Sequence, residues 1–209
     1  MPFGSAPAPR LSTKLFAPVF RYLRRQGLRI SVYIDDLIIL ARSIRQSIAH
    51  TQTAVDTLHH LGFSVHPEKC CLVPRRSQEF LGTQVNSNNM QFRVPQAKLR
   101  SIRRDVQAVF KLNDQRLLTV RHLASLLGKL NALRGAVISA QLHLWPFHHL
   151  LKSALARSSW TGLTALDPPV IEEMRWWHDE MQGWSGKSII PVRSQMVVTT
   201  DASSHGWGG

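Results

Sequence analysis

Two adjacent aspartates, Asp35 and Asp36, are the residues of this chain best suited to chemistry. They follow Tyr33 and Ile34, and strand-forming residues flank this tetrad at positions 29–32 and 37–40. The pattern predicts two strands joined by a tight turn, with both carboxylates at the tip of a hairpin. Paired carboxylates there suit divalent metal ions and phosphoryl or nucleotidyl transfer. A plain polar turn is the alternative, because Asp is common in turns.

The charge balance indicates a polyanionic partner. Lys and Arg number 26 against 13 Asp and Glu, so the net charge is +13. Nucleic acid is the simplest partner for such an excess, and an ordinary solvated basic surface is the alternative. No apolar run approaches the ~20 residues that span a bilayer, and no secretory signal is visible. The adjacent Cys70 and Cys71 form neither a disulfide framework nor a metal-ligand spacing. We therefore expect an intracellular protein, of the cytoplasm or nucleus, that is neither secreted nor bound to a membrane; its oligomeric state is left open.

Helices and short strands alternate over the first 94 residues, which predicts an α+β fold. Helical spacing of apolar residues predicts two helices, the first capped by Thr13 and ended by Gly27, the second ended by Gly62. In the second helix, Ile48, Val55, Leu58 and Leu61 are expected to face inward. The expected elements are a loop over 1–12, helices over 14–26 and 44–61, short strands at 63–65 and 71–73, and a hairpin that pairs 80–82 with 91–94.

The pattern becomes mostly helical after Pro95, a good first helical residue. Helices are expected over 95–111, 119–133 and 137–156, followed by a helix that bears Trp176 and Trp177 and a strand over 196–200. The two tryptophans are expected to pack in a core rather than stack on bases. In the second of these helices one broad apolar face is formed by Leu123, Leu126, Leu127, Leu130 and Leu133.

The order of the motifs resembles that of retroelement reverse transcriptases, of the type encoded by DIRS-like retrotransposons and their gypsy-like and hepadnaviral relatives. Tyr33-Ile34-Asp35-Asp36 looks like the YxDD catalytic hairpin. Pro67-Glu68-Lys69 is similar to the palm motif whose lysine lies near the incoming triphosphate, and Phe80-Leu81-Gly82 is similar to the primer grip. Thr200-Asp201-Ala202-Ser203 resembles the first strand of an RNase H domain.

The resemblance implies how the α+β chain is divided. Residues 1–94 would be a partial palm with the YxDD hairpin and a primer-grip-like hairpin. Residues 95–160 would be a helical thumb, residues 161–195 the connection, and residues 196–209 the truncated start of an RNase H-like domain. The implied partners are an RNA template, a DNA primer, their RNA–DNA hybrid and deoxynucleoside triphosphates.

The resemblance also implies a role for each site residue. Asp35 and Asp36 would hold two Mg²⁺ ions, with Mn²⁺ possible, and Lys69 would protonate or neutralise the leaving pyrophosphate. Asp201 would be a metal ligand of the RNase H remnant. The residues expected to contact nucleic acid are Tyr33, Gly4, Arg10, Lys14, Phe80, Leu81, Gly82, Arg121, Lys129 and Arg134. Each is also explained by a purely structural role, as a turn, core or surface residue.

The 209 residues depart from the family pattern at both ends. In the family, the first catalytic aspartate and the fingers precede the loop that Pro2-Phe3-Gly4 resembles, and the RNase H domain continues beyond the strand of Asp201. We therefore expect a reverse transcriptase fragment that is inactive by itself. The alternative is a non-catalytic RNA- or DNA-binding remnant, or a domesticated binding protein.

Overall fold

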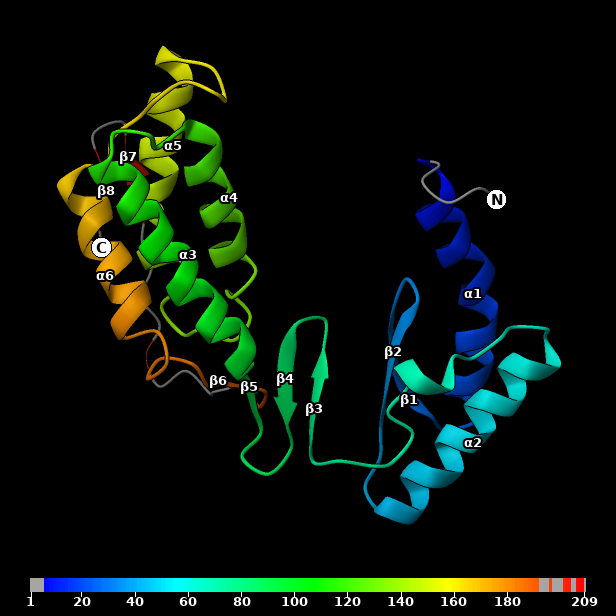
Figure 1. The fold of residues 1–209 in the computed structure, drawn as a ribbon. Coiled ribbons are helices and arrows are strands. Elements are labelled where there is room, and N and C mark those ends of the chain that lie inside the picture. The colour runs from blue at the N-terminus through cyan, green and yellow to red at the C-terminus, as the bar shows by residue number, and fades with distance from the viewer. Residues whose placement is uncertain (1–5, 192–195, 197–200, 204–205, 209) are drawn as a thin grey trace. The chain divides into compact units, whose positions relative to one another are not determined.

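The computed structural model describes residues 6–191, 196, 201–203 and 206–208, with side chains for 6–191 and 196. The chain divides into a first unit, Met1–Asn88, and a second unit, Asn89–Gly209. Figure 1 labels the helices and strands of both units. No helix of the described residues has both the length and the apolar character needed to cross a membrane.

Helix α1 spans Ala8–Arg25 and so begins earlier than expected. Pro9 lies in its first turn, where a proline costs no hydrogen bond because that N–H has no helical partner. Thr13 lies within the helix, and its Oγ1 donates to the carbonyl of Pro9 at 2.8 Å. The predictions of a loop through residue 12 and of a Thr13 cap were therefore wrong.

Two glycines end the helices of the first unit, as predicted. Gly27 follows α1 with φ 86°, and Gly62 follows α2 (Ile44–His60) with φ 81°. At each end the next N–H reaches back to the last turn, from Leu28 to the Leu23 carbonyl at 3.2 Å and from Phe63 to the Leu58 carbonyl at 2.9 Å. This left-handed cap satisfies carbonyls that the helix leaves free.

Strands β1 (Arg29–Tyr33) and β2 (Asp36–Leu40) form the antiparallel hairpin predicted around the two aspartates. Helix α1 packs on β1 and helix α2 packs on β2. In Figure 1 the hairpin lies beside the blue α1. The small core of this unit consists of the buried side chains of Phe20, Leu23, Leu28, Ile30 and Ala54.

Two expectations for the first unit were wrong. On α2 only Leu58 of the expected inward residues is buried, and Ile48 is 54% and Leu61 50% exposed, because the helix contacts the hairpin through a narrower stripe. Residues 63–65 and 71–73 are not strands, and the 3₁₀ helix η1 (Pro67–Lys69) lies between them. Their apolar residues resemble those of strands, but no described strand pairs with them.

A second tight hairpin is formed by β3 (Ser77–Phe80) and β4 (Thr83–Asn86). Its two turn residues, Leu81 and Gly82, have φ of 51° and 69°, the signs of a type I′ turn. The predicted pairing of 80–82 with 91–94 was wrong, because the chain already reverses at Leu81 and Gly82, before the turn expected at residues 86–89.

We expect Leu81→Asn to stabilise this hairpin. Leu81 is 48% exposed, so little packing is lost, and Asn tolerates the left-handed conformation better than Leu and completes the favoured Asn-Gly pair. The free energy of unfolding should rise by roughly 1 kcal/mol, as measured by urea denaturation followed by circular dichroism. Leu40→Asn is the control, because Leu40 is 51% exposed in a strand and has no positive φ to relieve. Equal effects of the two variants would contradict the role of the turn.

The second unit consists of a helical bundle and several short strands. Among the residues whose side chains are described, its core contains 22 buried residues, with Trp177 and Phe147 the largest. Helix α3 packs on α4 and α6, and α5 packs on α4 and α6. The elements are β5 (Gln91–Arg93), α3 (Gln96–Asp114), α4 (Val120–Asn131), η2 (Leu142–Leu144), α5 (Trp145–Arg157), α6 (Pro168–Asp179), β6 (Lys187–Ser188), β7 (Asp201–Ser203) and β8 (Gly206–Gly208).

The apolar face predicted for α4 is confirmed, because its four leucines, and Leu133 just after the helix, are at most 3% exposed. Thr119 caps α4 by accepting from the N–H of His122 at 3.3 Å. Helix α5 begins at Trp145 rather than at residue 137, because Pro146 favours the first turn of a helix. Trp177 is fully buried and Trp176 is packed against the core, as expected of both. The strand expected over 196–200 lies outside the described residues, apart from Met196.

Candidate functional site

The tip of the β1–β2 hairpin presents the two aspartates to solvent. Tyr33 is the last residue of β1 and pairs with Asp36, the first residue of β2. Asp35 therefore lies in the two-residue turn, next to Ile34. Both carboxylate residues are exposed, and Tyr33 is 59% exposed. The hairpin thus places an aromatic ring and two carboxylates at one end of a two-stranded sheet.

The turn itself is strained. Ile34 has φ 53°, a left-handed conformation that is a genuine outlier for a β-branched residue. Such a backbone costs on the order of 1–3 kcal/mol and persists where the surrounding structure enforces it, often at functional sites. Here the five-pair ladder of β1 and β2 enforces the tight turn that carries Asp35.

The tip supplies part of a metal site. Carboxylate oxygens are the ligands that Mg²⁺ prefers, and neither Asp35 nor Asp36 makes a hydrogen bond or ion pair within the described part of the chain. Both are therefore available to a cation. Among the residues whose side chains are described, however, no group of three or more His, Cys, Asp or Glu is placed to hold a metal ion. A two-metal centre would need at least one further ligand.

The other predicted site residues that the structure describes in the first unit lie on elements other than the β1–β2 hairpin. Lys69 ends η1 and is exposed, and no hydrogen bond or ion pair joins it to the carboxylates in the described residues. Phe80 ends β3, and Leu81 and Gly82 form the tip of the second hairpin. Arg10 and Lys14 are exposed on α1. Gly4 lies outside the described residues. The roles of all seven stay predictions.

The second unit presents a long segment free of negative charge. No Asp or Glu occurs in residues 115–166. Arg121 and Arg134 are exposed there, and Lys129 pairs through Nζ with Asp105 of α3 at 2.8 Å. An ion pair this exposed contributes roughly 0–1 kcal/mol to the stability of the fold, so Lys129 remains able to leave Asp105 and bind another anionic group. Asp201 lies in β7, and its side chain is outside the described residues.

Gly128 is a candidate that the sequence reasoning missed. It lies exposed in α4, beside Lys129. A glycine inside a helix costs about 1 kcal/mol relative to alanine. A Cβ added there would meet no atom within 4 Å, so packing within the chain does not require glycine. The open space leaves room for the close approach of a partner, and a glycine within a helical pattern was the signal that could have found this position.

Gly128→Ala is expected to stabilise the protein and weaken its binding to an RNA–DNA hybrid. The free energy of unfolding should rise by about 1 kcal/mol, because alanine is the better helix former and open space receives its methyl group. Urea denaturation and fluorescence anisotropy with a labelled hybrid measure the two effects. Gly135→Ala is the control, since it lies after α4 and also has open space around it. Unchanged affinity in Gly128→Ala would contradict close approach at this face.

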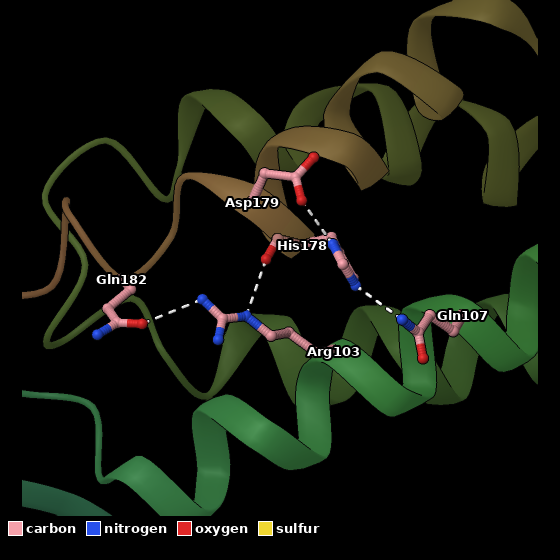
Figure 2. A network of polar contacts seen from close by, with 5 residues as sticks. All are labelled: Arg103, Gln107, His178, Asp179 and Gln182. Atoms are coloured by element: carbon pink, nitrogen blue, oxygen red, sulfur yellow. Dashed lines mark hydrogen bonds and ion pairs between the residues drawn. The ribbon is translucent and has the colours of Figure 1, made fainter.

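The polar network at the end of α6 is structural. Arg103 of α3 donates from Nε to the carbonyl of His178 at 3.0 Å and from Nη2 to Oε1 of Gln182 at 3.1 Å (Figure 2). His178 contacts Gln107 at 3.0 Å through Nε2 and Asp179 at 2.6 Å through Nδ1. The network ties α3 to the last turn of α6 and satisfies a carbonyl that the helix end leaves free. It holds no cation-binding cluster.

Parts of this chain are similar to known proteins. The family model described as reverse transcriptase (RNA-dependent DNA polymerase) matches residues 1–85, which include the β1–β2 hairpin that carries Asp35 and Asp36. The whole chain is similar to Polyprotein P3 of Commelina yellow mottle virus, with 21% identity over 208 residues. The chain spans only 10% of that polyprotein.

Two solved structures share the fold. One is the foamy viral protease-reverse transcriptase in complex with an RNA/DNA hybrid, with a TM-score of 0.65, 17% identity and coverage of 90% of this chain and 22% of that one. The other is the dRH form of that protein in complex with double-stranded DNA, with a TM-score of 0.60, 16% identity and coverage of 84% and 28%. The mixed helix and sheet architecture thus resembles that of a segment of these two structures.

Proposed function

We propose that the chain is a segment of an RNA-directed DNA polymerase that adds deoxynucleotides to a primer. The observation that carries this proposal is the hairpin whose tip exposes Asp35 and Asp36 within a match to the reverse transcriptase family. In the reaction, the 3′-hydroxyl oxygen of the primer forms a bond to the α-phosphorus of a deoxynucleoside triphosphate. The bond from that phosphorus to the bridging oxygen breaks, and pyrophosphate leaves.

The residues of the tip have distinct roles in this proposal. Asp35 and Asp36 hold divalent cations, Mg²⁺ or Mn²⁺, through carboxylate oxygens that have no other described partner. When bound, these ions orient the reactants and stabilise the charge that develops on the attacking and leaving oxygens. Tyr33 offers an exposed ring beside the primer terminus. Lys69 neutralises or protonates the leaving pyrophosphate.

Further carboxylates must come from outside the described residues if two metal ions are to bind. Strand β1 pairs only with β2, so its other edge is open to an added strand within the described part of the first unit. Next to it is a cavity of 480 Å³ whose lining is both apolar and basic, with Phe16, Phe20, Val32 and Ile34 beside Arg21, Arg24 and Arg25. We propose that a strand paired with this edge brings a further carboxylate, and that the 209 residues alone do not polymerise.

The finer assignment follows the motif order. We propose a retrotransposon of the DIRS-like or gypsy-like type as the source, with residues 1–94 as part of the palm, 95–160 as the thumb, 161–195 as the connection and 196–209 as the start of RNase H. The acid-free segment 115–166 supports contact between the thumb and the backbone of an RNA–DNA hybrid, because lysine and arginine contacts to phosphates set affinity.

A primer-extension assay tests the polymerase proposal. The 209-residue chain and a version joined to the strand-bearing segment of a related reverse transcriptase are compared with RNA template, DNA primer, deoxynucleotides and Mg²⁺. We expect product only from the joined version, and only with the metal. Absence of product from both, with the hybrid still bound, would favour a second function as a non-catalytic nucleic-acid-binding protein, which the same acid-free segment supports.

A further inference from the structure

Two adjacent cysteines lie exposed on the first unit. Cys70 and Cys71 are the only cysteines in the sequence, and both are free and exposed, although free cysteine is among the most buried residue types in proteins. Cys71 makes one weak contact, from Sγ to the carbonyl of Val73 at 3.5 Å, and the Cys70 side chain makes no hydrogen bond within the described residues. Packing therefore does not account for this pair, and both sulfur atoms are open to reagents in solution.

The segment that holds the two cysteines belongs to no helix and no sheet. Residues 70–76 run from the end of η1 to the start of β3. Cys70 has φ −100° and ψ 132°, an extended backbone in which successive side chains point to opposite sides of the chain. Because no described strand pairs with residues 70–76, the backbone can turn there without breaking a ladder of hydrogen bonds.

A disulfide between the two cysteines requires such a turn. Its Cβ atoms must lie about 3.5–4.5 Å apart, which side chains on opposite sides of an extended chain do not reach. The Cα atoms of adjacent residues are also fixed about 3.8 Å apart, below the usual range of about 4.4–6.8 Å, so the closed ring would be strained. Strained and exposed disulfides are the labile, regulatory ones. The pair is thus suited to reversible rather than structural bonding.

The sequence around the pair is basic. Residues 69–78 contain Lys69, Arg75 and Arg76 but no Asp or Glu, and the nearest acid in sequence is Glu68 of η1. Lys69 and Arg75 are exposed, and neither side chain makes a hydrogen bond or ion pair in the described part of the chain. Small disulfides of the glutathione type carry several carboxylates, so a surface of this charge favours their approach.

We propose that Cys70 and Cys71 form a reversible dithiol–disulfide switch that small anionic disulfides, of which glutathione disulfide is the probe, oxidise. The thiolate of one cysteine attacks a sulfur of glutathione disulfide. The new S–S bond joins one glutathione to the protein, the S–S bond of the oxidant breaks, and the other glutathione leaves as a thiolate.

The second cysteine completes the reaction. Its thiolate attacks the protein sulfur of the mixed disulfide, which closes the ring between Cys70 and Cys71 and releases the second glutathione. The two protons of the cysteine thiols end on the two released glutathione molecules, so two electrons pass from the protein to the oxidant. Ring closure replaces the extended link between η1 and β3 with a turn. The switch requires neither aspartate of the hairpin tip and does not depend on the polymerase proposal.

A structural zinc site fits the pair less well. Such sites take four ligands, mostly from Cys and His. Among the residues whose side chains are described, no group of three or more His, Cys, Asp or Glu is placed to hold a metal ion. A disulfide between two copies of the chain is the other alternative, because exposed thiols can also join molecules, and it is an outcome of the test.

Intact-mass spectrometry tests the switch in the full 209-residue chain. The reduced protein is incubated at low and high ratios of oxidised to reduced glutathione, and free thiols are then trapped with N-ethylmaleimide. Because the sequence has no other cysteine, each trapped thiol, bound glutathione or closed ring is read directly from the mass. Cys70→Ser and Cys71→Ser are the matched variants, since each keeps one thiol and cannot close the ring. Circular dichroism verifies that each variant is folded.

At the high ratio, the unsubstituted chain should lose the mass of two hydrogen atoms, trap no N-ethylmaleimide and retain no glutathione. Excess reduced glutathione should then restore both thiols, as expected of a strained disulfide. Each single variant should stop with one glutathione bound. An unsubstituted chain that retains glutathione without closing the ring, that is oxidised mainly to covalent dimers, or that stays reduced while the single variants are modified would overturn the proposal.

Charge variants test the part played by the basic surroundings. K69Q/R75Q should slow the oxidation at least about threefold at low salt and less at high salt, because salt screens the attraction of the anionic oxidant. R42Q/R45Q removes the same two charges from exposed positions of the same unit and should leave the rate unchanged. Equal slowing by the two pairs would contradict guidance of the oxidant by the side chains beside the cysteines.

Discussion

Replacing Trp177 with alanine is expected to destabilise the second unit by about 4 kcal/mol, the low-to-middle range for removing a fully buried tryptophan and its hydrogen bond. Trp177 is 0% exposed in the core cluster. Its ring meets Trp176 edge-on at 5.2 Å between centroids, and its Nε1 donates to the carbonyl of His143 at 3.1 Å. Alanine removes these contacts, leaves a cavity and leaves that carbonyl without its donor. Because domains are stable by only about 5–15 kcal/mol, much of the unit's stability would be lost.

Urea denaturation followed by far-ultraviolet circular dichroism measures this loss. Trp145→Ala is the matched control, because Trp145 is 68% exposed on α5 and its removal should change the free energy of unfolding by less than about 0.5 kcal/mol. The loss of unfolding free energy in Trp177→Phe should fall between those of Trp177→Ala and Trp145→Ala, since an aromatic ring remains but the N–H donor does not. A Trp177→Ala protein as stable as the control would show that this core is not what stabilises the helices.

In a chain completed with a further carboxylate-bearing strand, Asp35→Asn should lower the rate of primer extension by at least about 10³-fold. Asparagine retains the size of the side chain but loses the charge that holds a divalent cation. Metal-assisted charge stabilisation supplies several kcal/mol, and each 1.36 kcal/mol is a factor of ten in rate. Single-turnover extension with a hybrid prebound to the protein measures the chemical step apart from binding.

Asp56→Asn provides the control for Asp35→Asn. Asp56 is exposed on α2, where its Oδ1 accepts from Gln52 at 2.8 Å, and the same change should leave extension unaffected. Hybrid binding should survive both substitutions, because it rests on basic side chains. Extension that persists in Asp35→Asn would remove the hairpin tip from the proposed reaction. Product made by the 209 residues alone, and lost in Asp35→Asn, would show that no further carboxylate is needed.

Local signals in the sequence determined several elements and the candidate site. Runs of β-branched and aliphatic residues on both sides of the Asp pair specified the β1–β2 hairpin, because a tight turn between two strands depends on neighbours in sequence. The leucine spacing of α4 specified its buried face in the same way. Gly27 and Gly62 marked helix ends because they take the left-handed conformation that the cap requires.

Tertiary structure decided what depends on partners distant in sequence. Ile48 and Leu61 match the inward pattern of α2, yet the hairpin covers only part of that pattern, so they are exposed. Residues 63–65 and 71–73 have the composition of strands but no strand to pair with, whereas Leu81-Gly82 reverses the chain directly between β3 and β4. A strand forms only where a partner strand supplies its hydrogen bonds, and a side chain is buried only where another surface covers it. Local periodicity determines neither of these. The strained φ of Ile34 and the open space around Gly128 are visible only once the chain is folded.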